Sequence, residues 1–233
     1  MGTGIVDQPL ASLVAASVAF VGTHFAMSHP LRAGMVRVLG DTGFQIAYSL
    51  VSFATIGWMV LAFRAIGPGG AMLWDGMSDA LWVVATLIML PASVLLVGSF
   101  FGNPAIPASG AAALADKPVH GVFHATRHPM MWSFALWALS HVLVSPTPRS
   151  LVLCAAIAFL ALVGAHLQDR KKEALMGAAW AGWEAQTSYA LRPTRLARAG
   201  LVPWLGGLVL WLAASWAHIP LNGMAAGVWR WLG

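Results

Sequence analysis

The chain has 233 residues, of which 59% are apolar and only 9% carry a charge, and its mean hydropathy is +0.75. A soluble domain cannot bury so large an apolar share, so the composition predicts an integral membrane protein. The net charge of +5 is not arranged as a basic stripe interleaved with aromatic residues, which excludes nucleic-acid binding as its purpose. The single Cys154 lies in an apolar run and forms no disulfide framework.

Six apolar runs approach the length that a bilayer core of about 30 Å requires. They cover residues 10–27, 43–65, 81–100, 129–144, 151–167 and 201–216. No basic segment precedes the first run, so we expect it to stay as a span and not to be a cleaved signal peptide. The prediction is an all-α, polytopic bundle of about six transmembrane helices, forming one domain over residues 1–233.

Two further segments are predicted to be short amphipathic helices. In residues 169–188 apolar side chains, including Trp180 and Trp183, recur at helical spacing opposite charged ones. We expect this segment to lie along the membrane or to fold back on the bundle. Residues 219–233 suit a short interfacial helix better than a seventh span.

Basic residues predict the orientation of the bundle. In a six-span arrangement ten of the thirteen Lys and Arg residues fall on one side, in loops 28–41, 102–128 and 168–199. The positive-inside rule therefore predicts that these loops are cytoplasmic and that both termini are non-cytoplasmic.

The sequence Arg127-His128-Pro129 begins the fourth apolar run. Proline suits the first turn of a helix, so Arg127 and His128 are expected at its N-terminal mouth, where the helix dipole favours anions. Arg127 is a candidate to bind a haem propionate or a cofactor phosphate, and the alternatives are a lipid phosphate or a salt bridge to Asp169. We predict a polar cluster that caps a pocket, with Ser188 and Tyr189 near its rim. Its members are Arg127, His128, Asp169 and Arg170.

Histidines supply the other candidate ligands. His120, His124 and His128 form one ridge if their segment is helical, which suits either a metal site or interfacial side chains that reach the headgroups. His24 and His141 instead lie inside apolar runs, where each is either a hydrogen-bonded core residue or an axial ligand of a haem. Their depths differ, at roughly 7 Å and 18 Å from the predicted cytoplasmic ends of their helices. His24 paired with His166 or with His128 is therefore a competing ligand set.

Taken together, the motifs resemble the NnrU family of bacterial membrane proteins. The resemblance spans about residues 22–191 and rests on Gly22-Thr23-His24, Arg32, Gly40, Tyr48, Ser49, Ser52, Thr126-Arg127-His128-Pro129, Trp137, His141, Asp169-Arg170-Lys171 and Thr187-Ser188-Tyr189. NnrU proteins are similar to 15-cis-zeta-carotene isomerases, which carry haem b with two histidine ligands. The resemblance implies haem b here, held by His24 and His141, with Ala138 standing where the isomerase has a redox-active cysteine.

For function, the resemblance implies a haem-dependent isomerase or oxidoreductase acting on a lipophilic substrate, or a factor of nitrite and nitric oxide respiration, in the bacterial inner membrane. The arginine-histidine-proline motif also occurs in isoprenylcysteine carboxyl methyltransferases and sterol reductases. The alternative is therefore an enzyme that binds S-adenosylmethionine or a nicotinamide nucleotide at the cytoplasmic face. A non-enzymatic accessory protein is the third possibility.

Overall fold

The computed structural model describes residues 8–106 and 110–232, and these residues form helices and no strand. The longer helices are α1 (Gln8–Ser28), α2 (Arg32–Ala65), α3 (Asp79–Gly98), α5 (Pro129–Val144), α6 (Pro148–Met176) and α8 (Leu201–Asn222). Shorter elements are α4 (Ala111–Ala115), α7 (Ala178–Gln186) and the 3-10 helices η1 (Gly121–His124), η2 (Pro193–Ala199) and η3 (Gly227–Trp231).

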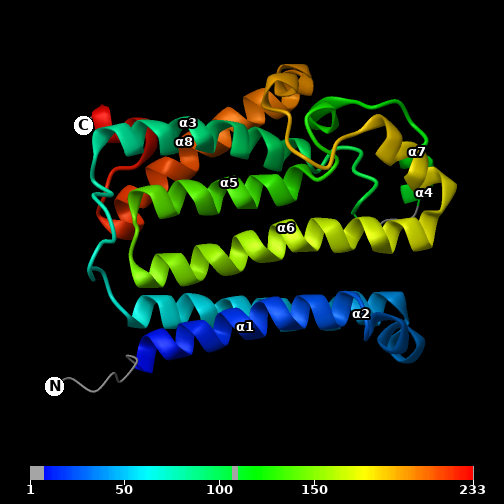
Figure 1. Cartoon of the computed structure of the whole chain (residues 1–233), viewed down its shortest axis with the longest axis horizontal. Coiled ribbons are helices and arrows are strands. Elements are labelled where there is room, and N and C mark those ends of the chain that lie inside the picture. The colour runs from blue at the N-terminus through cyan, green and yellow to red at the C-terminus, as the bar shows by residue number, and fades with distance from the viewer. Residues whose placement is uncertain (1–7, 107–109, 233) are drawn as a thin grey trace.

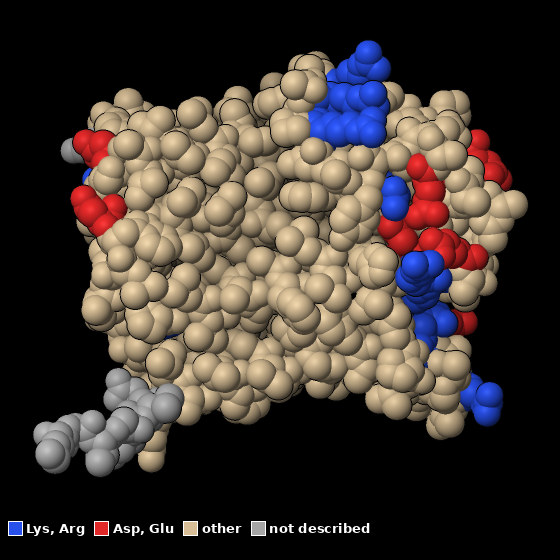
Figure 2. Space-filling view, viewed as in Figure 1, with Lys and Arg blue, Asp and Glu red and all other residues tan. Residues whose placement is uncertain are grey.

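Five of the described helices, α1, α2, α3, α6 and α8, are long and apolar enough to cross a membrane. The sixth, α5, is apolar but has 16 residues, which is about 24 Å of helix. Figure 2 shows a broad band without charged side chains across the middle of one face of the molecule. The chain is thus a multi-pass membrane protein, and the predicted all-α polytopic bundle is confirmed.

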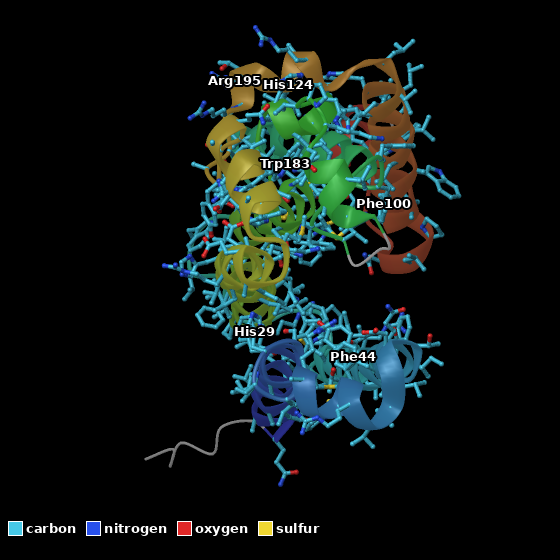
Figure 3. All side chains as sticks on the ribbon, turned by 90° about the vertical axis from the view of Figure 1, so that its right-hand side faces the viewer. His29, Phe44, Phe100, His124, Trp183 and Arg195 are labelled. Carbon is cyan, nitrogen blue, oxygen red and sulfur yellow. The ribbon has the colours of Figure 1, made fainter. Side chains whose placement is uncertain are left out.

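Helix α6 lies at the centre of the arrangement (Figure 1). It packs against α5 on one side and against α1 on the other. Helices α1 and α2 form a hairpin that joins the rest mainly through α6, and α3 packs against both α5 and α8. Viewed along the bundle, this hairpin, marked by His29 and Phe44, forms one side of the molecule, and the body that contains Trp183 forms the other (Figure 3).

The contact between α3 and α8 is close because α8 carries glycine there. A Cβ atom placed on Gly207 would lie 2.7 Å from the Cα of Val94. Small residues allow such an approach of two helix backbones in a membrane, where packing and not water exclusion holds helices together.

Two helices are longer than the predicted spans. Helix α2 begins at Arg32 and not at residue 43, so most of the predicted loop 28–41 is helical, with a kink at Gly40 (φ 69°, ψ 171°). Only glycine adopts this conformation readily, and the kink lets the first two turns of α2 change direction. Helix α6 likewise continues beyond residue 167 to Met176, which carries Asp169 on a regular helix.

The segment after α6 folds back on the bundle, which is one of the two arrangements that its periodicity allows. Helix α7 packs against α4 and α6, and Trp180 and Trp183 are fully buried in a core with Phe123 and Leu196. The C-terminal segment forms the end of α8 and then η3, which packs against α8 and α3.

Charged side chains gather at one end of the bundle, which we call the charged end (Figure 2). The ends of α1 and α6 and the starts of α2 and α5 meet there, together with α7 and η2 (Figure 1). Gln8 and Leu232, the first and last described residues, both lie at the opposite end. That the charged end is cytoplasmic stays a prediction.

Candidate functional site

The residues just before α5 are held by the segment that follows α7. The backbone N–H of Arg127 donates to the carbonyl of Ser188 at 2.8 Å, and that of Arg192 donates to the carbonyl of Ala125 at 2.9 Å. Pro129 occupies the first turn of α5, as predicted, so the helix loses no hydrogen bond there. The start of α5 and the segment 188–192 therefore form one rigid wall of the site.

Tyr189 is fixed at both of its ends. Its carbonyl accepts hydrogen bonds from Thr126 Oγ1 at 3.0 Å and from Trp132 Nε1 at 2.8 Å. Its hydroxyl donates to the carbonyl of Leu162 at 2.7 Å. The ring lies beside the Arg127 guanidinium, whose Cζ is 5.6 Å from the ring centroid, and it meets the His128 ring edge-on.

Arg127 is bound by two carboxylates. Its Nε and Nη2 atoms donate to Oδ2 of Asp169 at 3.0 and 2.6 Å, and Nη2 lies 3.1 Å from Oε1 of Glu184. The side chains of Arg127 and Asp169 are 13% and 6% exposed. The salt bridge to Asp169, one of the alternatives given for Arg127, is thus present and largely buried.

His128 is hydrogen-bonded to the same aspartate. Its Nε2 lies 2.8 Å from Oδ1 of Asp169, and its side chain is fully buried. An ionised carboxylate only accepts hydrogen bonds, so Nε2 carries the proton and Nδ1 of the neutral ring carries a lone pair. Within the described residues no group donates to this Nδ1. The result is an Asp–His pair with a free basic nitrogen.

An open pocket of about 280 Å³ lies against this cluster at the charged end. It is lined by Arg127, His166, Asp169, Arg170, Glu173, Glu184 and Tyr189. A second, much smaller hollow of about 30 Å³ lies on the other side of the motif, lined by Arg127, His128, Met130, Met131 and Ile106 among others. Arg127 borders both, so the motif separates a charged pocket from a more apolar hollow.

Burial at the pocket wall disfavours the negatively charged forms of Glu184 and Tyr189. Burial raises the pKa of Glu184, and Arg127 opposes this effect only in part. Burial also raises the pKa of the Tyr189 hydroxyl, with a smaller contribution from Asp169. A ligand cation beside Glu184 would relieve the cost of its negative charge.

The four residues predicted to cap a pocket lie close together. Arg127, Asp169 and Arg170 border the large pocket. His128 does not border it, but is hydrogen-bonded to Asp169 from the protein interior. Tyr189 lies at the rim as expected, whereas Ser188 contributes its backbone carbonyl to Arg127.

His24 and His141 are not brought together. Helices α1 and α5 run in opposite directions with α6 between them, and each histidine lies near the last residue of its helix (Figure 1). His24 is therefore at the charged end and His141 at the opposite end. The structure does not bring the two histidines together within one copy of this chain, and a haem held by both stays a prediction drawn from the resemblance.

The competing pairs for His24 are not assembled either. Its Nδ1 meets the carbonyl of Phe20 at 2.7 Å, and its Nε2 faces Ser52 on α2 at 3.3 Å. His166 borders the large pocket instead, and His128 is engaged by Asp169. His24 has the hydrogen bonds of a satisfied core histidine.

The ridge of three histidines is not formed. His120 precedes the short η1, His124 ends it, and His128 is the residue before α5, so no continuous helix carries all three. Among the described residues, no group of three or more His, Cys, Asp or Glu side chains is placed to hold a metal ion. The continuous ridge is therefore not formed, and the described structure gives no support to the metal interpretation.

Glu184 is the member of the cluster that the sequence did not single out. It is one of the charged residues on the polar face of the predicted amphipathic helix 169–188, and it pairs with Arg127 at 3.1 Å. The signal available was its position, three residues before Thr187-Ser188-Tyr189.

These features define a multi-pass helical membrane protein with a buried ion-pair cluster bordering an open pocket at one end. The chain matches the family described as NnrU protein over residues 12–226, and it belongs to that family. No curated protein and no solved structure matches it.

Proposed function

We propose that this NnrU family protein is a membrane enzyme that binds a zwitterionic, S-adenosylmethionine-like cofactor at the charged end and modifies a lipophilic substrate. The observation that carries the proposal is the Asp169–His128 pair, in which Asp169 lines the pocket and His128, which borders the small hollow, keeps a buried basic nitrogen without a partner among the described residues. A merely structural cluster gains nothing from such a nitrogen, because a buried polar atom without a partner costs stability.

The charges around the pocket favour one of the two cofactor classes considered. Two arginines, Arg127 and Arg170, face three carboxylates, those of Asp169, Glu173 and Glu184. A nicotinamide dinucleotide would bring its phosphates next to these carboxylates, with Arg127 already bound to two of them. A ligand with an ammonium group, a sulfonium and one carboxylate matches this mixed, slightly acidic lining.

The residues have separate roles in this proposal. Glu184 and Glu173 receive the cationic groups of the cofactor, and Arg170, which is exposed and paired only loosely with Glu173 at 3.5 Å, receives its carboxylate. Tyr189 offers an aromatic face at the rim. When bound, such a cofactor supplies an electrophilic methyl group.

His128 acts on the substrate side. Asp169 fixes the ring in the tautomer with a free Nδ1 and stabilises the imidazolium that forms when this nitrogen takes a proton. The hollow of about 30 Å³ lined by Met130, Met131 and Ile106 borders His128. It must widen to admit a lipophilic thiol or alcohol, which then gives its proton to Nδ1 and attacks the methyl group of the cofactor, with the uncharged thioether as the leaving group.

The test compares wild type with His128→Gln in detergent or nanodiscs. The glutamine amide still donates to Asp169 but has no basic nitrogen, so cofactor binding is retained and turnover falls at least a hundredfold. Transfer of a radiolabelled methyl group from S-adenosylmethionine to octanethiol and octanol is measured. Asp41→Asn is the matched control, because Asp41 lies at the same end but is 76% exposed and outside the pocket. Equal turnover in His128→Gln and wild type would contradict the role of His128.

A further inference from the structure

Three arginines form a row on the segment that leads into α8. Arg192 precedes η2, and Arg195 and Arg198 lie within it. The backbone N–H of Arg195 donates to the carbonyl of Arg192 at 3.0 Å, which is the bond of a 3-10 turn. A 3-10 helix has three residues per turn and a rise of about 2.0 Å, so side chains three positions apart share one face at intervals of about 6 Å. We call this row of Arg192, Arg195 and Arg198 the arginine ridge.

Another face of η2 is anchored in the protein. Leu196 and Ala199 are buried, in the same core as Phe123 of η1. The carbonyl of Leu196 also accepts a hydrogen bond from Nε1 of Trp204 on α8 at 3.3 Å. Because packing and a hydrogen bond hold η2 in place, the arginine ridge is a fixed feature of the surface.

The arginine ridge has no acidic partner within residues 8–106 and 110–232. Its three arginines are exposed, and none of them belongs to an ion pair formed by these residues. His124 lies beside Arg195 (Figure 3). Burial lowers the pKa of His124, and the nearby positive charges, that of Arg198 first, lower it further. Positive charge thus accumulates here without compensation, which favours an anionic ligand.

The arginine ridge borders an apolar surface on α8. Gly200 turns the chain (φ 87°, ψ 167°), and α8 begins immediately after it with Leu201 and Val202, which are 72% and 61% exposed. Trp204 follows, and tryptophan is enriched where a membrane meets water. Figure 2 shows Lys and Arg side chains grouped at the edge of the charge-free band, at the place of η2, the orange segment before α8 in Figure 1. The arginine ridge therefore lies at the depth of lipid headgroups.

We propose that the arginine ridge binds the phosphate headgroups of anionic lipids, whose acyl chains lie against the start of α8. Guanidinium groups bind phosphate oxygens through two parallel hydrogen bonds, and basic residues clustered beside a span attract anionic headgroups. The exposed Leu201 and Val202 favour a lipid over a free phosphate or an acidic protein, because only a lipid brings apolar chains to cover them. The surface is independent of the cofactor proposed for the pocket.

The experiment mixes the full-length protein in detergent with equal amounts of phosphatidylglycerol and phosphatidylcholine that have the same acyl chains, and measures bound lipid by native mass spectrometry. Wild type is expected to bind phosphatidylglycerol at least tenfold more tightly than phosphatidylcholine. A basic residue near the surface contributes roughly a factor of five to the binding of anionic lipid, so Arg195→Gln/Arg198→Gln should weaken phosphatidylglycerol binding at least tenfold. Both side chains are exposed and unpaired within the described residues, so the thermal unfolding temperature should not change.

Arg37→Gln/Lys117→Gln is the matched control, because it removes two exposed basic residues at the same end of the bundle but outside the arginine ridge. This variant should bind phosphatidylglycerol as wild type does. Inorganic phosphate and polyglutamate, each at millimolar concentration, should not displace the lipid.

The proposal is overturned if wild type binds the two lipids equally, or if the two double variants lose phosphatidylglycerol alike. Displacement by inorganic phosphate would overturn it in favour of a site for free anions. Displacement by polyglutamate would overturn it in favour of an acidic protein partner.

Discussion

Arg127 donates to Asp169 from two nitrogen atoms, Nε at 3.0 Å and Nη2 at 2.6 Å, across 42 positions of sequence. This two-point contact joins the start of α5 to the end of α6. The neighbouring His128 adds a further hydrogen bond to the same carboxylate. One aspartate thereby fixes both the cation that borders the pocket and the imidazole that we propose as the proton acceptor.

Replacing Asp169 by asparagine should destabilise the protein strongly. The change leaves the buried Arg127 guanidinium without its main counter-charge, and breaking a buried ion pair from one side costs about 3 kcal/mol. Thermal unfolding in detergent, followed by a thiol-reactive dye at the buried Cys154, measures this effect. Asp41→Asn should leave the transition within error, since the Asp41 side chain is 76% exposed and its partner Arg32 is 3.7 Å away. A similar loss of thermal stability in both variants would show that the buried ion pair contributes no more to stability than the exposed one.

Arg127→Lys tests the geometry of the contact and not its charge. Lysine keeps the positive charge but lacks the planar fork, so it cannot bond Asp169 from two nitrogens and still face Glu184. We expect a loss of about 1–2 kcal/mol in the free energy of unfolding. If stability is unchanged, the contribution of Arg127 is purely coulombic.

Cofactor binding should depend on pH through Glu184. Its pKa is raised by burial, so the carboxylate takes up a proton at a pH above the ordinary range of glutamate. As the pH falls through this raised pKa, Glu184 loses its charge and the affinity for S-adenosylmethionine should decrease. In Glu184→Gln the affinity should be weaker at neutral pH and vary less with pH over the same interval. Titration calorimetry between pH 5 and 8 measures both, and identical pH profiles would exclude Glu184 from the cofactor contact.

Trp180→Ala should loosen the helix that carries Glu184. Trp180 lies on α7, and its side chain is fully buried in the core. Truncating a buried tryptophan costs about 3–5 kcal/mol. Trp231→Ala in η3 is the matched control, because Trp231 is 46% exposed and should tolerate the change. Equal unfolding temperatures of the two variants would contradict the anchoring role of Trp180.

Gly207→Ala should destabilise the bundle, whereas Gly22→Ala should not. An added Cβ at Gly207 meets the backbone of Val94 at 2.7 Å, and overpacking of this kind costs about 1–3 kcal/mol. Gly22 lies inside α1 with nothing within 4 Å of the added atom, so alanine there should be neutral or stabilising. Detergent unfolding curves of both variants test the close α3–α8 contact, and equal stability would argue against it.

Much of the fold was predictable because apolar runs of bilayer length nearly always form transmembrane helices. The extension of α2 before residue 43 was not, since Arg32 and Arg37 suggest a loop and the kink at Gly40 shows only in the backbone. Glu184 was missed because its partner, Arg127, lies far away in sequence and only the folding back of α7 brings them together.

The separation of His24 and His141 was visible in the sequence, whereas their pairing as haem ligands was favoured by the resemblance. Successive spans alternate in direction, so the first and fourth helices end on opposite sides, and the predicted depths of roughly 7 Å and 18 Å already differed. The histidine that does lie next to His141 is His218, with ring centroids 6.2 Å apart. It lies near the end of α8 and beyond the predicted span 201–216, so nothing in the sequence linked it to His141.

The central claim is that the pocket at the charged end binds a zwitterionic cofactor, and titration calorimetry with S-adenosylmethionine tests it most directly. Wild type in detergent should bind one equivalent, Glu184→Gln should bind at least tenfold more weakly, Asp41→Asn should match wild type, and NADPH should produce no saturable binding. Absence of saturable S-adenosylmethionine binding to folded wild type at millimolar concentration would contradict the claim, as would saturable binding of NADPH in its place.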